Sequence, residues 1–355
     1  MIVRSHLVIS CVVAGLLGLV TVSARGPRDA EILEQLKARV DAQKAVGMVV
    51  GTIDADGKTS MAAYGSPGPG SLPLDADSVF EIGSITKVFT AILLADMVDR
   101  GEVALDDPIA NYLPKNMRVP EKNGRKITLL DLSMQVSGLP RMPDNFKPAN
   151  PQNPYVDYTV ERMYDFLSRH ELRRDPGALF EYSNLGVGLL GHVLTLRAGK
   201  PYEQLVKERI LEPLDMDHTA ITLTPWMQQH LVKGHNVKGE VVSNWDVGVL
   251  AAAGGLRSTL TDMLKFARAN LQATDRLTRV MQRTHAERAN AGNPAMFIGM
   301  NWIIRRSDGQ DVTWHNGGTA GYRTWMGFDA RRKTAAVVLT NSGHGADDLG
   351  FELLK

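Results

Sequence analysis

The chain has 355 residues, of which 44% are hydrophobic and 22% charged, and its formal net charge is +1. A chain of this length and apolar content can bury one large core or two modest ones. Its charges are interspersed and nearly balanced, which argues against the basic surface of a nucleic-acid-binding or membrane-surface protein.

The first 24 residues have the pattern of a secretory signal peptide. An almost unbroken apolar run over 7–22 ends at Val22-Ser23-Ala24, a plausible cleavage site. Cleavage after Ala24 would place the mature domain, 25–355, in the periplasm or outside the cell, with membrane contact only through the signal segment. The alternative is an uncleaved anchor, although about 16 apolar residues fall slightly short of a full span. The sole cysteine, Cys11, lies in this run, so cleavage would leave no thiol.

The N-terminal part of the mature chain combines helices with a hairpin. Apolar residues at helical spacing predict an amphipathic helix over 29–43. Two β-rich runs, 46–54 and 59–64, flank an Ala-Asp-Gly turn and predict a hairpin. A helix is expected from Ser84 to about Arg100, with Gly101 as its C-terminal glycine.

From about 106 to 284 the chain is expected to be mostly helical with long loops. A helix is predicted over 184–198, another over 263–271 with Thr259 as its N-cap, and a loop over 143–155. Strand patterns return at 311–315, 322–329 and 334–341.

These patterns predict an α/β (α+β) fold, in which strands from both chain ends form one antiparallel sheet flanked by helices. The α/β part would comprise about 25–105 and 285–355, and the inserted, mostly helical part about 106–284. We expect a monomer.

Ser84 and Lys87 are three residues apart at the start of the predicted helix, so they share one face. A serine hydroxyl needs a base to become a nucleophile, and a desolvated lysine can have its pKa lowered enough to serve. The Ser-x-x-Lys motif alone is weak evidence for a catalytic pair, because about one such motif is expected by chance in a chain of this length. The strongly apolar helix that follows favours a buried Lys87 over an exposed one.

Tyr182-Ser183-Asn184 lies on a loop at the entrance of the 184–198 helix. Tyr182 could act as a phenolate-type base if a cation such as Lys87 depresses its pKa. Asn184 offers a donor and an acceptor to a substrate amide. A simple helix N-cap is the alternative, and both roles can coexist.

The third candidate is Trp314-His315-Asn316-Gly317-Gly318, on or just after a strand. Gly317 and Gly318 let a substrate backbone lie along the strand, and an N–H near Gly318 could form an oxyanion hole with that of Ser84. His315 could bind a substrate carboxylate or pass a proton. A glycine-rich turn between strands is the alternative.

Ser-x-x-Lys, Tyr-x-Asn and His-x-Gly, in this order, resemble the motifs of the serine penicillin-recognising family: class C β-lactamases, D-Ala-D-Ala carboxypeptidases and related esterases. The likeness spans roughly 30–350 and extends to 80–87, 129–140 and 253–259. It implies a β-lactamase/transpeptidase-like fold with Ser84 as nucleophile. It also implies that Lys87 and Tyr182 share proton transfer, that Asn184, His315 and Gly317 bind substrate, and that Ser84 and Gly318 form the oxyanion hole.

Two positions depart from the class C pattern. His315 stands where most β-lactamases have lysine, and a histidine is only partly charged near neutrality. Met142 stands where class C enzymes commonly have glutamine, whose amide bond methionine cannot donate. Both cast doubt on efficient β-lactam turnover.

The expected reaction is hydrolysis through an acyl-enzyme on Ser84, without cofactor or metal. A small molecule or peptide is the expected substrate. β-Lactams come first, then D-Ala-D-Ala or other D-amino-acid peptides, then short-chain esters. A penicillin-binding sensor without turnover is the non-enzymatic alternative. No Gly-x-Ser-x-Gly elbow, His-Glu-x-x-His pair or phosphate-binding glycine loop supports another chemistry.

Overall fold

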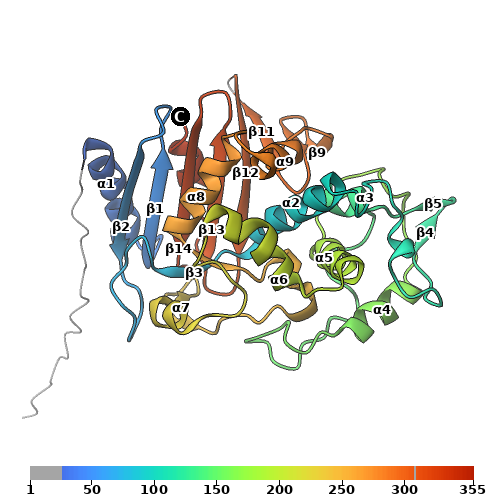
Figure 1. Ribbon diagram of the computed structural model, residues 1–355. Coiled ribbons are helices and arrows are strands. Elements are labelled where there is room, and N and C mark those ends of the chain that lie inside the picture. The colour runs from blue at the N-terminus through green and yellow to red at the C-terminus, as the bar shows by residue number, and fades with distance from the viewer. Residues whose placement is uncertain (1–25, 308) are drawn as a thin grey trace, which may run out of the picture.

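A computed structural model describes residues 26–307 and 309–355, and the expected signal segment 1–24 lies outside them. At its centre is an eight-stranded antiparallel sheet in the order β2-β1-β14-β13-β12-β11-β10-β9 (Figure 1). The strands are β1 Gly47–Ile53, β2 Thr59–Gly65, β9 Ala289–Asn293, β10 Met296–Ile298, β11 Ile303–Ser307, β12 Gln310–Gly318, β13 Arg323–Asp329 and β14 Thr334–Thr340. The prediction that both chain ends share one sheet is confirmed, because β1 pairs with β14.

Strands β9 to β11 were not predicted. They are short, and the edge strand β9 is mostly exposed and consists of Ala, Asn and Gly, residues with low strand preference. The predicted hairpin over 46–54 and 59–64 and the three strands after residue 310 are confirmed within a few residues.

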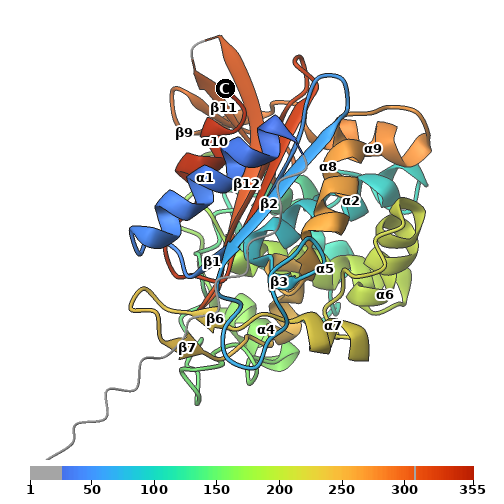
Figure 2. The same cartoon turned by 90° about the vertical axis from the view of Figure 1, so that its left-hand side faces the viewer.

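Helices cover both faces of the sheet (Figure 2). α1 (Pro27–Asp41) and α10 (Asp347–Glu352) lie on one face, and α2 (Thr86–Asp99), α8 (Leu260–Asn270) and α9 (Arg276–Thr284) lie on the other. Because side chains alternate along a strand, Val312 and Trp314 of β12 pack under α1 and α10. His315 points to the opposite face, toward α2.

Helix α2 is the central helix of the molecule. Twelve of its 14 residues are buried, since it is apolar all round and has neighbours on every side. Toward the sheet, Phe89 stacks on Phe266 of α8 with ring centroids 4.1 Å apart. On the other side lie α5 (Asn184–Ala198) and the 3₁₀ segment η5 (Gly248–Ala253). Helix α2 thus joins the sheet to the helical part.

The helical part lies beside the sheet (Figure 1). Its helices, besides α5 and η5, are η2 Ile109–Asn111, α3 Leu129–Ser133, α4 Val160–Arg169, α6 Tyr202–Val206, η3 Lys207–Leu211, η4 Glu212–Leu214 and α7 Pro225–His230. Short pairs were missed: β3 Val79–Glu81 with β8 Arg257–Thr259, β4 Glu121–Lys122 with β5 Arg125–Lys126, and β6 Gly234–His235 with β7 Val241–Val242. Helices α8 and α9 fall within 106–284, yet α8 packs on strands β1 and β14 of the sheet.

Several predicted helix ends are confirmed. Helix α5 has the predicted bounds, and Gly199 follows it at φ +65°. The Thr259 side chain accepts a hydrogen bond from the Asp262 N–H and caps α8. The predicted loop over 143–155 contains no helix or strand. None of the helices within 26–307 and 309–355 is long and apolar enough to cross a bilayer.

Candidate active site

Ser84 lies in a single 3₁₀ turn, η1 (Gly83–Ile85), directly before α2. The sequence predicted it in the first turn of the α-helix itself. Gly83 has φ +52°, and a Cβ there would lie 2.7 Å from the backbone nitrogen of Gly318. Only glycine allows this conformation and this approach, so Gly83 brings the Ser84 turn against the end of β12.

Lys87 is fully buried behind Ser84. A 2.8 Å hydrogen bond joins its Nζ to the Ser84 Oγ, and Nζ also donates to the Ala253 carbonyl at 2.6 Å. Burial disfavours the ammonium form and the Arg141 charge adds to the effect, so the pKa of Lys87 lies well below its usual value. A neutral amine at this distance can accept the hydroxyl proton.

Tyr182 completes this side of the site. It hydrogen-bonds with Ser84, and its ring centroid lies 4.9 Å from the Lys87 Nζ. Burial raises the pKa of Tyr182 to about 12, an effect that the Ser84 bond and the Arg141 charge only partly offset. Tyr182 would act as a phenolate-type base only if a cation depressed its pKa, and that condition is not met, because desolvation outweighs the effect of the Arg141 charge. Tyr182 is therefore a neutral phenol at neutral pH.

His315 of β12 lies beside this pair, with its ring centroid 6.2 Å from that of Tyr182. Its side chain is 1% exposed, and its Nδ1 lies 2.6 Å from the Asn316 carbonyl oxygen, to which it donates. Burial, followed by the Lys87 charge, lowers the pKa of His315 to about 3. The expectation of a partly charged histidine near neutrality is therefore wrong.

Gly317 and Gly318 bring β12 close to Ser84. A Cβ on Gly317 would lie 1.9 Å from the Ile82 carbonyl oxygen, so any side chain would push η1 away from the strand. The Thr324 hydroxyl of β13 donates to the same carbonyl at 2.9 Å. These two contacts with the Ile82 carbonyl fix the position of Ser84 relative to the sheet.

The N–H of Gly318 points away from β13. In an antiparallel ladder, hydrogen-bonded and non-bonded pairs alternate. The next residue, Thr319, donates to Tyr322 at 3.1 Å, so the Gly318–Arg323 pair is a non-bonded one. Pairing with β11 begins only at Trp314. The Gly318 N–H therefore faces the Ser84 turn, as an oxyanion hole requires.

A pocket of about 170 Å³ opens in front of Ser84. Asn184, at the start of α5, lies in its wall, with Nδ2 3.8 Å from the Met142 sulfur. The lining residues are Gly83, Ser84, Arg141, Met142, Tyr155, Asn184, Trp245, Val247, Leu250, Ala253, Gly254, Gly318 and Thr319. Lys87, Tyr182 and His315 are absent from this set and lie behind Ser84. Arg141, which the sequence analysis did not single out, is the one charged residue in the wall.

A buried chain of amides ties the Tyr182 loop to α2. The Asn301 amide donates to the Lys87 carbonyl at 3.2 Å and accepts from Gln135 at 2.9 Å. The Gln135 side-chain oxygen then accepts from the Ser183 N–H at 2.7 Å. Neither amide could be predicted from the sequence, because no local pattern marks residues that meet only through tertiary contacts.

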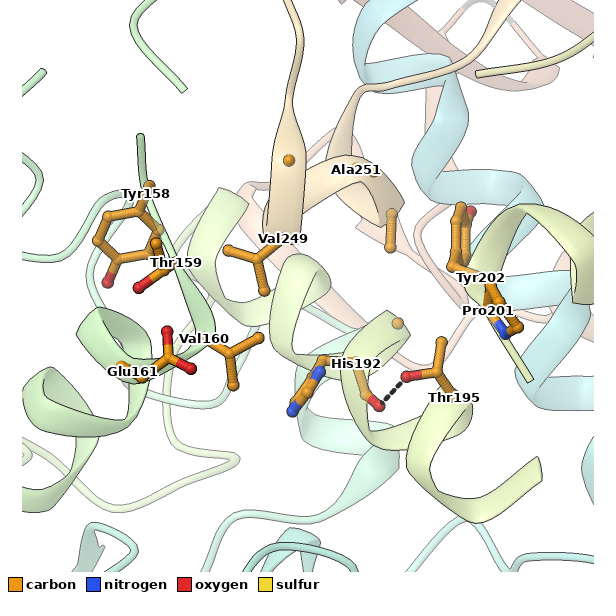
Figure 3. A pocket seen from close by; sticks show the side chains of 13 residues that line it. Tyr158, Thr159, Val160, Glu161, His192, Thr195, Pro201, Tyr202, Val249 and Ala251 are labelled. Carbon is orange, nitrogen blue, oxygen red and sulfur yellow. Dashed lines mark hydrogen bonds between the residues drawn. The ribbon is translucent and has the colours of Figure 1, made fainter. Parts of the chain in front are cut away.

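A second cavity, of about 490 Å³, lies behind η5 and between α4, α5 and α6 (Figure 3). Val249 and Ala251 of η5 face this cavity, whereas Leu250 and Ala253 line the Ser84 pocket. The segment η5 is thus a wall shared by two cavities. Its last carbonyl, that of Ala253, is also the one that holds Lys87.

The sheet built from both chain ends and the Ser84–Lys87 pair define the class of the protein as a serine hydrolase. A sequence model of the beta-lactamase family matches residues 32–353, and the chain belongs to that family. No group of acidic, histidine or cysteine side chains within the described residues could hold a metal ion.

Relatives of this chain are named as D-alanine carboxypeptidases, as beta-lactamases or as both. The chain is 30% identical over 333 residues to the D-alanyl-D-alanine-carboxypeptidase/endopeptidase AmpH of Escherichia coli K12, covering 87% of this chain and 85% of AmpH. It is 26% identical to a beta-lactamase of the same strain, with 86% of each covered. Its structure resembles a Yersinia pestis beta-lactamase/D-alanine carboxypeptidase with a TM-score of 0.78, at 26% identity over 92% of this chain and 99% of that one. A Rhodobacter sphaeroides class C beta lactamase shares the fold with a TM-score of 0.74, at 23% identity, with 89% and 94% covered.

Proposed function

We propose that the protein hydrolyses D-alanyl peptides through an acyl-enzyme on Ser84. The observation that carries the proposal is the 2.8 Å contact between Ser84 Oγ and the Nζ of the fully buried Lys87. A base without charge beside the hydroxyl is what nucleophilic attack requires.

In the first half of the reaction, Ser84 Oγ attacks the peptide carbonyl carbon and its proton passes to Lys87. The N–H groups of Ser84 and Gly318 stabilise the oxyanion, and the Asn184 amide binds the substrate amide. As the C–N bond breaks, the proton passes from Lys87 through the Tyr182 hydroxyl to the leaving amine.

In the second half, water attacks the ester carbonyl. Its proton moves to Lys87, with Tyr182 as relay, and then to the departing Ser84 oxygen. A carboxylic acid is released and the enzyme is restored. Because Tyr182 is a neutral phenol, it passes protons without carrying a charge of its own.

Two observations favour peptides as substrates, although the sequence analysis placed β-lactams first. His315 stands where most β-lactamases have lysine, and a histidine at that position resembles some D-Ala-D-Ala peptidases. The AmpH likeness supports the same order.

β-Lactam hydrolysis is the second candidate function. The beta-lactamase relative covers 86% of this chain, and a lactam amide would acylate Ser84 through the same steps. The signal-like segment 1–24 supports export to the periplasm or the medium, where both substrate classes are met.

The decisive experiment compares the mature protein with Ser84→Ala in two assays. One measures D-alanine released from diacetyl-L-Lys-D-Ala-D-Ala, and the other follows intact mass with benzylpenicillin. We expect D-alanine release and a single penicillin adduct on the wild type only. Ser168→Ala, in α4, serves as the matched control and should behave as wild type.

Peptide turnover with a penicillin adduct that lasts for hours supports the peptidase. Loss of the adduct within seconds and no release of D-alanine would favour the β-lactamase instead. Activity that survives in Ser84→Ala would refute the acyl-enzyme.

A further inference from the structure

The pocket in front of Ser84 holds more hydrogen-bond donors than the protein itself satisfies. Arg141 lines it and is exposed, and no described residue forms an ion pair or hydrogen bond with its guanidinium. The guanidinium carbon of Arg141 lies over the Tyr182 ring, 5.0 Å from the ring centroid. No aspartate or glutamate lies in the pocket wall to neutralise it.

Two neutral donors in the same wall also lack partners. The Thr319 Oγ1 and the Trp245 Nε1 are buried and form no hydrogen bond to any described residue. A buried donor without a partner is unfavourable, so such groups usually pair with a water molecule or a ligand. Tyr155 connects this side to Arg141, because the Arg141 charge acts on its hydroxyl and its ring centroid lies 5.2 Å from that of Trp245.

The positions of the groups around Ser84 indicate which part of a substrate lies near Arg141, Thr319 and Trp245. The leaving amine must take its proton from the Tyr182–Lys87 side, where His315 also lies. The Gly318 N–H faces the reacting carbonyl, and Thr319 comes one residue further along the chain. The backbone N–H of Asn184, the residue proposed to bind the substrate amide, donates to the Arg141 carbonyl at 3.0 Å, so an acyl part held by Asn184 lies beside Arg141, in the pocket that Thr319 and Trp245 also line.

We propose that Arg141, supported by the Thr319 hydroxyl and the Trp245 N–H, binds an anionic group on the acyl side of the substrate. The preferred acyl donor would then carry a carboxylate in the second residue before the scissile bond, or in the acyl side chain of a lactam, which occupies the same position. This inference rests on the proposed function, since it assumes that acyl donors occupy the Ser84 pocket.

A matched pair of penicillins isolates this interaction. Benzylpenicillin and α-carboxybenzylpenicillin differ by one carboxylate on the acyl side chain, and their leaving-group sides are identical. We would measure both dissociation constants by calorimetry on Ser84→Ala, where no acylation can occur. We expect α-carboxybenzylpenicillin to bind roughly 10- to 100-fold more tightly, the range for a charged hydrogen bond.

In the Ser84→Ala protein, a second substitution Arg141→Gln should abolish the preference for α-carboxybenzylpenicillin. Arg141→Lys in the same background should keep part of this preference. Thr319→Val should reduce it, whereas Lys147→Gln, an exposed cation outside the pocket, should leave it unchanged. Equal binding of the two penicillins to Ser84→Ala, or a preference that survives Arg141→Gln, would overturn the inference. An Arg141-dependent preference without any turnover by the wild type would instead uphold the inference and refute only the proposed hydrolysis.

Discussion

At the residue scale, Lys87, Tyr182 and His315 lie together behind Ser84, and burial disfavours the charged form of each of them. Desolvation lowers the pKa of Lys87, raises that of Tyr182 to about 12 and lowers that of His315 to about 3. A proton can therefore move through this group while only one charge at a time is created in the interior. Arg141, at the exposed end, is the permanent cation nearest to them.

The depressed pKa of His315 should make stability depend on pH in a defined window. The unfolded chain takes up the imidazole proton near pH 6.5 and the folded protein only near pH 3, so acidification between these values favours unfolding. Stability contributed by the neutral imidazole is complete above pH 6.5 and declines below it, by at most about 1.4 kcal/mol per pH unit.

Urea unfolding of wild type and His315→Gln from pH 3.5 to 8 tests this. The free-energy difference between the two proteins should be constant above pH 6.5, and the wild type should lose stability more steeply below that value. Parallel curves over the whole range would show that the folded protein does not exclude this proton.

At the element scale, the contact between α5 and η5 positions Lys87. Gly188 and Gly191 of α5 face η5 so closely that a Cβ on Gly191 would lie 2.1 Å from the Cβ of Ala252. The carbonyl of Ala252 accepts from Thr90 at 2.7 Å, and the carbonyl of Ala253 accepts from Lys87 at 2.6 Å. A displacement of η5 would thus move a hydrogen-bond partner of Lys87 directly.

Gly191→Ala is expected to lower both stability and activity. Alanine gains about 1 kcal/mol in helix preference, but overpacking a tight contact costs about 1–3 kcal/mol, so we expect net destabilisation. The rate of Ser84 acylation by benzylpenicillin should fall at least about tenfold, as the Ala253 carbonyl moves away from Lys87. Gly345→Ala is the control, because no atom lies within 4 Å of its added Cβ. An unchanged acylation rate in Gly191→Ala would mean that η5 does not position the base.

At the scale of the whole molecule, the two ends of the described chain close the outer face of the sheet together. Helices α1 and α10 cover a separate core around Trp314 and Trp325, and Arg39 of α1 pairs with Asp348 of α10 at 2.5 Å. The opposite face carries α2 and with it Ser84. Both faces share β12 and β13, so the outer core supports the strand that bears His315 and Gly318.

Leu349→Ala in α10 tests this closure. Leu349 is 1% exposed, and truncating such a buried leucine costs about 2–5 kcal/mol, measurable as a lower urea midpoint. Glu352→Ala, at an exposed position of the same helix, should shift stability by less than about 0.5 kcal/mol. Equal effects of the two substitutions would indicate that α10 does not seal the core.

Local pattern in the sequence determined the hairpin of β1 and β2, the capped helix α5, the strands after residue 310 and the stacking of Lys87 on Ser84. These features depend on the two-residue period of strands, the helical repeat and capping chemistry, all of which act over a few neighbouring residues. Tertiary structure alone decided the protonation of Tyr182 and His315 and the exposure of the Arg141 charge. It also decided that η5 separates two cavities and that Gln135 and Asn301 are joined by a hydrogen bond. Desolvation and hydrogen bonding between distant segments depend on which surfaces meet, and that is settled only when the helical part folds against the sheet.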